Sequence, residues 1–328
     1  MNKRMQSLLG CALILGVIAL AVAGLGHLFR PFETDLSANA IYDFHDLPEN
    51  SVEVLVYGSS HAWRGLDSME MYRNYGIGIY NYGCNWQHIN TTGLFVKDSL
   101  RTQTPKVVLI DTFRAHDPLI DTAMDGEIYY SRFIPDMPEK WTYLRRCFGS
   151  SAQRYLSYFV PFVAFHSNWG NLADWSFQDQ TEAIDFHATM GYLPTPGVVK
   201  VDIGDPTQFE QLPLGEDGLR ELDEIVAACR EKNVKIIFYT APWQGIYRYG
   251  DAMTAYAAEN DCEYFNLFEM MDEVGLDQET DFCDTSHLNE SGAKKVANFF
   301  GSYIREHYDV MDMRAVPGNL WETAAQEK

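Results

Sequence analysis

Two short segments, far apart in the chain, contain the residue types of nucleophilic catalysis. The first is Gly58-Ser59-Ser60-His61, which follows a β-branched run at 52–57. A serine where a strand turns into a helix can present its hydroxyl as a nucleophile and its backbone N–H to a developing oxyanion. The simpler interpretation is that Ser59 or Ser60 only caps the following helix. This segment alone leaves both roles open.

The second segment is Asp284-Thr285-Ser286-His287, which directly precedes the last expected helix. Serine is a weak nucleophile and needs an adjacent base, and a histidine oriented by a carboxylate is such a base. The three-residue spacing lets base and carboxylate come from one loop. An Asp-x-x-His pair by itself is equally typical of a surface loop. Only in combination with Ser60 does it predict a Ser-His-Asp triad.

Short apolar strands that alternate with helices must position these two segments. Such alternation predicts an α/β fold with a parallel sheet covered on both faces. The expected strands are 52–57, 79–82, 106–111, 234–239 and a weaker one at 263–265, and the clearest helices are 216–232 and 290–307. Ligands of such folds bind beyond the carboxyl ends of the strands. The segments expected there are 58–64, 83–88, 111–116, 240–244 and 281–287.

The turn after the first strand, the Asp-x-x-His before the last helix and the alternation between them resemble the SGNH (GDSL-like) hydrolase superfamily. The resemblance covers about residues 52–308. It implies a three-layer α/β/α flavodoxin-like fold. It also implies that Ser60 is the nucleophile, that His287 is the base and that Asp284 orients the base.

The oxyanion hole of that superfamily also uses a glycine N–H after the second strand and an asparagine side chain after the third. Gly83 matches the glycine. The third strand is followed by Asp111-Thr112-Phe113-Arg114, which contains no Gly-x-Asn. The family's Gly-Asp-Ser is also Gly58-Ser59-Ser60 here. The candidates for the missing donor and for other substrate contacts are Asn85, Arg114, His61 and Arg64.

The N-terminus predicts a membrane segment. Lys3 and Arg4 precede an apolar run at 8–25 that extends to Phe29. This run can cross the roughly 30 Å hydrocarbon core as a helix, and cations before it favour a cytoplasmic N-terminus. A cleaved signal peptide is the alternative, because Ala21-Val22-Ala23 fits a small-x-small cleavage site. We expect an uncleaved single-pass anchor at 1–29, because the apolar run continues past that site. Either way, the rest of the chain is expected outside the cytoplasm.

Beyond the anchor we expect a polar linker at 30–51, a catalytic domain at 52–310 and a C-terminal tail at 311–328. The domain contains an insertion at about 114–215 that is rich in aromatic residues. The insertion predicts a helical subdomain with its own core, or a lid or platform that stacks on sugar rings. Five of its aromatic residues have helical spacing: Tyr155, Tyr158, Phe159, Phe162 and Phe165.

Charge and composition exclude several classes of protein. The chain has 328 residues, 46% of them hydrophobic, and a formal net charge of −21. The average composition excludes a disordered or collagen-like protein, and the acidic charge argues against nucleic-acid binding. Residues 201–290 contain 21 acids against 5 bases. The cysteines and histidines lack zinc spacing, and the acids lack a calcium-loop spacing, so no metal or cofactor is predicted.

A Gly-Ser-Ser-His turn behind a membrane anchor resembles the exported branch of the superfamily more closely. That branch includes the alginate O-acetyltransferase-like proteins and the D-alanine transfer protein of teichoic acid synthesis. The resemblance implies an O-acetyltransferase that acts on a cell-surface polysaccharide through an acyl ester on Ser60, with a membrane-bound acyltransferase as the acyl donor. The acidic charge favours a neutral glycan over a polyanionic one. A carbohydrate esterase and a catalytically inert surface-binding protein of the same fold are the alternatives.

Overall fold

The computed structural model describes residues 3–30, 32–115, 126–171 and 184–326. The fold is built on a five-stranded parallel sheet with the strand order β2-β1-β3-β4-β5. Its strands are β1 (Val54–Tyr57), β2 (Ile79–Asn81), β3 (Val107–Asp111), β4 (Lys235–Thr240) and β5 (Glu263–Asn266). The chain places β2 on one side of β1 and then β3, β4 and β5 on the other side. Such a change of side opens a crevice beyond the carboxyl ends of the strands. The predicted α/β fold with a parallel sheet is confirmed.

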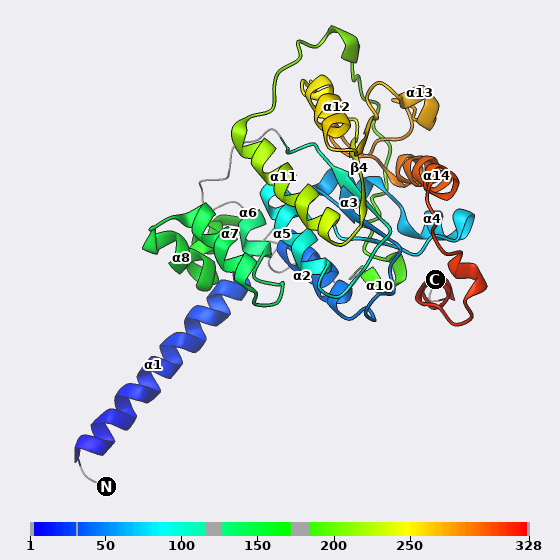
Figure 1. Ribbon diagram of the computed structural model, residues 1–328. Coiled ribbons are helices and arrows are strands. Elements are labelled where there is room, and N and C mark those ends of the chain that lie inside the picture. The colour runs from blue at the N-terminus through cyan, green and yellow to red at the C-terminus, as the bar shows by residue number, and fades with distance from the viewer. Residues whose placement is uncertain (1–2, 31, 116–125, 172–183, 327–328) are drawn as a thin grey trace.

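Helices cover both faces of the sheet, because successive strand residues point to opposite sides (Figure 1). Leu55 and Tyr57 of β1 belong to one core cluster, whereas Val54 and Val56 belong to the other. The first cluster is packed by α5 (Ile89–Ser99), α11 (Glu216–Glu231) and α12 (Gly250–Glu259). The second is packed by α3 (Ser60–Gly65), α4 (Ser68–Tyr75), α13 (Met271–Val274) and α14 (Glu290–His307).

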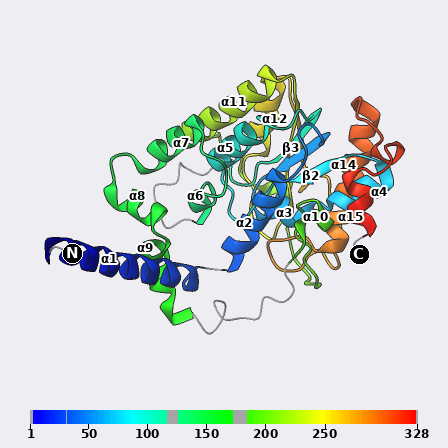
Figure 2. The ribbon, with the colours of Figure 1, turned by 90° about the horizontal axis from the view of Figure 1, so that it is seen from below.

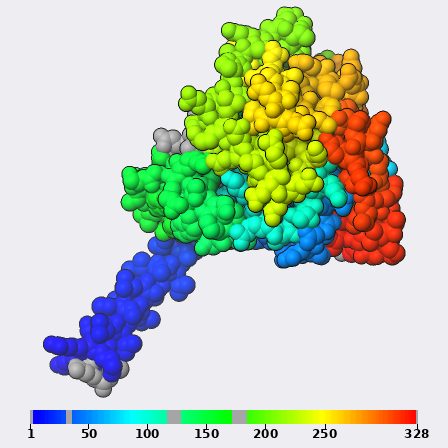
Figure 3. Space-filling model, in the orientation of Figure 1, coloured from blue at the N-terminus to red at the C-terminus, as the bar shows by residue number. Residues whose placement is uncertain are grey.

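Helix α1 (Lys3–Leu28) projects away from the rest of the molecule (Figures 1 and 3). It is the one helix of the described residues that is long and apolar enough to cross a membrane. The expected polar linker at 30–51 differs from the structure, because it contains helix α2 (Phe32–His45). Ile41 and Phe44 of α2 are buried, and the ring of Phe44 stacks on Tyr82 at 4.0 Å between centroids. Apolar residues spaced three and four apart make α2 an amphipathic helix of the core.

The described part of the insertion is helical. It comprises α6 (Gly126–Tyr130), α7 (Pro138–Phe148), α8 (Ala152–Phe159), α9 (Pro161–Phe165), η1 (His166–Asn171), α10 (Phe186–Thr189) and η3 (Pro206–Gln208). Tyr155 and Tyr158 pack on Phe148, with ring centroids 5.1 and 5.7 Å apart. Phe148 and Tyr158 belong to the same core cluster as Leu55 and Tyr57 of β1, so these helices pack on the sheet domain instead of forming a separate core. Two parts of the predicted insertion, 116–125 and 172–183, lie outside the described residues.

The C-terminal segment is part of the fold rather than a free tail. It contains η4 (Met313–Ala315) and α15 (Leu320–Gln326). Trp321 is fully buried, and its ring N–H donates to the carbonyl of Ile79 at 2.8 Å. This bond joins α15 to the edge strand β2. The expected boundary at residue 310 therefore does not separate a loose tail from the domain.

Candidate active site

The turn after β1 separates the roles of its two serines. Gly58 has φ +145°, and a Cβ at this position would lie 2.6 Å from the Cβ of Asp111. Only glycine fits such a turn. Ser59 is buried and caps α3, because its Oγ accepts from the backbone N–H of His61 at 3.3 Å. The cap is therefore Ser59, and the hydroxyl of Ser60 is left for the site.

Ser60, His287 and Asp284 form a continuous chain of hydrogen bonds. The Ser60 Oγ lies 2.8 Å from His287 Nε2. The other ring nitrogen of His287, Nδ1, lies 2.9 Å from Asp284 Oδ2 and 3.1 Å from Oδ1. Asp284 also accepts from the backbone N–H groups of Ser286 and His287, at 2.6 and 2.9 Å. The loop thus fixes its own carboxylate, which in turn orients the ring, as the three-residue spacing predicts.

The electrostatics of this chain favour a neutral imidazole beside an ionised carboxylate. Burial lowers the pKa of His287, the positive charge of Arg64 lowers it further, and the bond to Asp284 opposes both. Burial acts against the ionised form of Asp284, but the bonds from His287 and from the loop amides keep its pKa below the ordinary value. A neutral ring that hydrogen-bonds a serine hydroxyl is the state that a general base requires.

Gly83 does not offer a free amide to the site. Its N–H donates to the side-chain Oδ1 of Asn81 at 3.1 Å. A Cβ at Gly83 would lie 3.2 Å from both the carbonyl oxygen of Gly58 and the Cβ of Trp63, so the glycine allows close packing there. The expected oxyanion role of Gly83 is thus not met in this arrangement. The backbone N–H of Ser60 remains a candidate donor, since it lies in the first turn of α3, where amides have no partner within the helix.

His61 lies beside the triad but is not part of it. Its side chain is only 4% exposed, and its ring centroid is 5.3 Å from that of His287. It contacts Phe113 edge-on at 3.8 Å and stacks near Trp243 at 5.5 Å. Burial and the neighbouring His287 lower the pKa of His61 well below its ordinary value. His61 is therefore a neutral member of an aromatic wall next to Ser60.

The other residues predicted to contact substrate, Arg114, Arg64 and Asn85, differ in their distance from the triad and in their partners. Arg114 donates through Nε to His88 Nε2 at 3.1 Å, and its guanidinium lies 5.0 Å from the ring centroid of Trp86. Arg64 is half-buried and acts on His287 through its charge. Asn85 is half-buried in the loop between β2 and α5. The structure therefore brings Arg64 into electrostatic contact with the triad, whereas Arg114 is engaged with its own aromatic and histidine neighbours.

The five strand-end segments converge at one edge of the sheet. Gly58 N–H donates to the side chain of Gln87 at 2.8 Å, and Ser59 Oγ lies 3.4 Å from Asp111 Oδ2. The backbone N–H of Gln244 donates to the carbonyl of Thr285 at 2.7 Å, which joins the loop after β4 to the loop that carries Asp284 and His287. His116, at the end of one predicted segment, lies outside the described residues.

Comparison with known proteins gives no family for this chain. No family model and no curated protein matches it. It is similar to the solved structure of "a putative acylhydrolase" from Bacteroides fragilis NCTC 9343, with 10% sequence identity and a TM-score of 0.40. The match covers 81% of this chain and 93% of the other.

Sequence reasoning missed the buried carboxyl group of Asp111. This residue ends β3, and its side chain is 4% exposed. Burial raises its pKa to about 7, although hydrogen bonds from the backbone of Phe113 and Ala241 and from Ser59 oppose the shift. The only signal in the sequence was its place at a strand end. Trp243 and Phe113 were missed for the same reason, since aromatic residues at strand ends are also typical of a core.

Three side chains that could hold a metal ion lie apart from the triad. They are Asp43 and Asp46 at the end of α2 and His187 on α10, and their ligand atoms lie within 4.8 Å of one another. His187 Nε2 is 3.3 Å from Asp43 Oδ1. The sequence does not predict this group, because His187 is far from Asp43 and Asp46 along the chain. Nothing links the group to the chemistry of Ser60.

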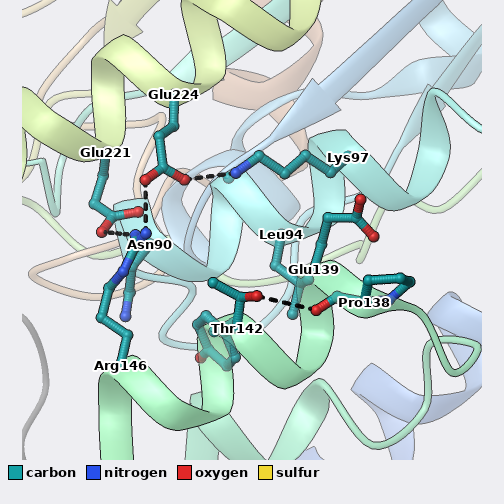
Figure 4. Close-up of a pocket in the computed structure, with 11 residues that line it drawn as sticks. Asn90, Leu94, Lys97, Pro138, Glu139, Thr142, Arg146, Glu221 and Glu224 are labelled. Carbon is teal, nitrogen blue, oxygen red and sulfur yellow. Dashed lines mark hydrogen bonds and ion pairs between the residues drawn. The ribbon is translucent and has the colours of Figure 1, made fainter.

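A cavity of about 150 Å³ lies between α5, α7 and α11 and contains none of the triad residues (Figure 4). Four of its five charged side chains form ion pairs with one another. Arg146 of α7 pairs with Glu221 and Glu224 of α11 at 2.6 and 2.7 Å, and Lys97 of α5 pairs with Glu224 at 2.6 Å. We interpret this cavity as part of the packing contact between the insertion and the sheet domain, and not as a substrate site.

Proposed function

We propose that the protein is a membrane-anchored serine acyl-transfer enzyme, an O-acetyltransferase that modifies a cell-surface polysaccharide. The observation that carries the proposal is the hydrogen-bonded chain from Ser60 Oγ through His287 to Asp284, with distances of 2.8 and 2.9 Å. Nucleophile, base and orienting group stand in the order that acyl transfer through serine requires.

In the first half-reaction, Ser60 Oγ attacks the carbonyl carbon of the acyl donor, and its proton moves to His287 Nε2. The carbonyl electron pair moves to the oxygen, and the backbone N–H of Ser60, at the start of α3, is the donor that we propose for this oxyanion. When the carbonyl re-forms, the bond to the leaving group breaks and that group takes the proton from His287. The product is an acyl ester on Ser60. Asp284 holds the ring of His287 and stabilises its charged form.

In the second half-reaction, His287 takes the proton of a sugar hydroxyl, whose oxygen attacks the ester carbon. The bond to Ser60 Oγ breaks, and the serine recovers its proton from His287. We propose that a membrane-bound acyltransferase supplies the acyl group. The net charge of −21 supports a neutral glycan as the acceptor, since a polyanion would be repelled.

We propose that α1 remains as a single-pass anchor with Lys3 and Arg4 on the cytoplasmic side. This orientation follows the bias of cations toward the cytoplasm. The catalytic domain would then lie outside the cytoplasm, where surface polysaccharides are found.

Labelling with a fluorophosphonate probe tests the nucleophile. The full-length protein should be labelled, and Ser60→Ala should abolish labelling. Ser59→Ala is the matched control, because Ser59 is the neighbouring serine but serves as the helix cap. This control should keep its labelling and lose about 1 kcal/mol of stability. An unlabelled wild-type protein would support the inert binding protein instead.

An assay with an activated acetyl ester and a neutral oligosaccharide separates transfer from hydrolysis. Transfer predicts acetylated oligosaccharide that disappears in Ser60→Ala. If the wild-type protein releases only free acetate at every acceptor concentration, the carbohydrate esterase replaces the transferase.

A further inference from the structure

The helices of the insertion expose several large apolar side chains that are not buried in the core. Leu156 and Phe159 of α8 are 52% and 50% exposed, and Trp169 of η1 is 72% exposed. Trp141 of α7 is 39% exposed, and its ring centroid lies 6.1 Å from that of Phe159. We call these four residues the α8–η1 surface.

Helix α8 is apolar on two sides. Tyr158 faces inward, where its ring packs on Phe148 and its hydroxyl lies 2.9 Å from Ser131 Oγ. Leu156 and Phe159, three residues apart, face outward. The inner side is buried in the core that the insertion shares with the sheet. The outer side has no such role in the described structure. Phe159 and Trp141 are neighbours there, and neighbouring exposed apolar side chains mark an interaction site.

The end of α1 lies against this part of the insertion. Helix α9 packs beside the last turns of α1 (Figure 2), and a Cβ at Gly26 would lie 2.7 Å from the backbone nitrogen of Phe162. The rings of Phe29 and Phe162 are 5.8 Å apart. Asn168 of η1 donates to the carbonyl of Phe29 at 3.4 Å. If α1 spans the bilayer, these contacts hold α8, α9 and η1 at the level where the chain leaves it.

The charge of this region differs in sign from that of the whole chain. Residues 138–171 contain four bases and one acid, a net charge of +3, whereas the chain carries −21. Of these bases, Arg146 is paired with Glu221 and Glu224, and Lys140 is buried. Arg145, which is exposed, and Arg154 are among the four bases. Basic groups beside exposed tryptophan, phenylalanine and leucine are the composition of surfaces that lie in the headgroup region of anionic membranes.

We propose that the α8–η1 surface is a second membrane contact, which binds the lipid headgroup and acyl boundary of the leaflet from which α1 emerges. The contact would hold the catalytic domain against the bilayer instead of leaving it on a flexible tether. This inference requires α1 in the membrane and is independent of the chemistry of Ser60.

Tryptophan quenching by brominated lipid tests the contact in the full-length protein. The protein is reconstituted in vesicles of phosphatidylcholine and phosphatidylglycerol, in which the phosphatidylcholine is brominated at the acyl carbons nearest the headgroup. The chain has seven tryptophans and none lies in α1, so quenching reports on the domain rather than on the anchor. We expect quenching of the wild-type protein relative to unbrominated vesicles, and less quenching in Trp169→Phe.

The double variant Leu156→Glu, Phe159→Glu should reduce quenching further, because carboxylates resist burial at the acyl boundary. Met311→Glu is the matched control, since Met311 is 55% exposed on the segment after α14 and should leave quenching unchanged. Resistance to carbonate extraction shows that α1 is still inserted, and probe labelling at Ser60 separately reports the proposed function.

Three results would overturn the proposal: no quenching of the wild-type protein, equal quenching in Trp169→Phe, or unchanged quenching in the double glutamate variant. The first would leave the surface free for a protein partner within the membrane.

Discussion

The carboxyl edge of the sheet and the joint between the insertion and α1 are built in opposite ways. At the sheet edge, Ser60 and His287 come from distant parts of the chain and meet at 2.8 Å among buried neighbours. At the joint, α8, α9 and η1 follow one another in the sequence and leave apolar side chains exposed. The residues proposed for catalysis meet only through the fold, whereas the surface proposed to contact the membrane is built from helices that are consecutive in the sequence.

The insertion shares its core with the sheet, but the exposed residues of the α8–η1 surface lie outside that core. Arg146 of α7 pairs with Glu221 and Glu224 of α11, and Glu221 is only 3% exposed. We therefore expect changes at the sheet edge to act on catalysis and changes at the joint to act on membrane contact, with little exchange between them.

The largest expected effect is on the chemistry of the triad. Asp284→Asn should lower the rate of acyl transfer by about 10³- to 10⁴-fold, because the amide cannot hold His287 in the tautomer that accepts from Ser60. Steady-state kinetics with the activated acetyl ester measure the change. The brominated-lipid signal should stay as in the wild-type protein. A rate within tenfold of wild type would mean that His287 is not oriented through Asp284.

Two glycines with positive φ, one in each region, allow the tightness of packing to be compared through the loss of folding stability in Gly→Ala variants. Gly58→Ala should destabilise the protein by about 2–5 kcal/mol, because its φ is +145° and its Cβ would lie 2.6 Å from the Cβ of Asp111. Gly149→Ala, in the insertion, should cost only about 1–3 kcal/mol, since φ +56° and ψ −126° disfavour a side chain but nothing lies within 4 Å of its Cβ position. Thermal unfolding in detergent compares the two. Equal losses would contradict the tighter packing assigned to the sheet edge.

Two glycines of α1 test the joint. Gly26→Leu should separate α1 from α9, because even a Cβ would lie 2.7 Å from the backbone of Phe162. Gly10→Leu is the control, as nothing lies within 4 Å of its Cβ position. We expect Gly26→Leu, but not Gly10→Leu, to reduce quenching by brominated lipid. Both variants should keep probe labelling at Ser60, and loss of labelling in Gly26→Leu would show that the regions are coupled.

The smallest expected effect is a shift in pH dependence. The positive charge of Arg64 disfavours protonation of His287 and so lowers its pKa, in addition to the larger effect of burial. Arg64→Gln should therefore raise the pKa of His287, and the rise of activity with pH should move to higher pH. A pH profile of kcat/KM measures the shift. Movement to lower pH would contradict the assigned direction.

The sequence predicted the residues that meet but not all of their roles. The strand pattern and the two motifs placed Ser60, His287 and Asp284 at one sheet edge, because parallel strands end on the same side. The role of Gly83 was wrong in this arrangement, since its amide is taken by Asn81 Oδ1. The linker prediction also failed. Ile41 and Phe44 have the spacing of an amphipathic helix, but only the structure shows that this side packs into the core against Tyr82.

By itself, the sequence determined the alternation of strands and helices, the apolar N-terminal helix and the loop that carries both Asp284 and His287. These features depend on local periodicity and spacing, which can be read from a short stretch of sequence without its tertiary neighbours. Tertiary structure decided which serine caps α3 and which meets His287, that Asp111 is buried deeply enough to raise its pKa to about 7, and that α9 and η1 meet the end of α1. Hydrogen-bond competition, desolvation and packing depend on neighbours far along the chain, and only the fold supplies those neighbours.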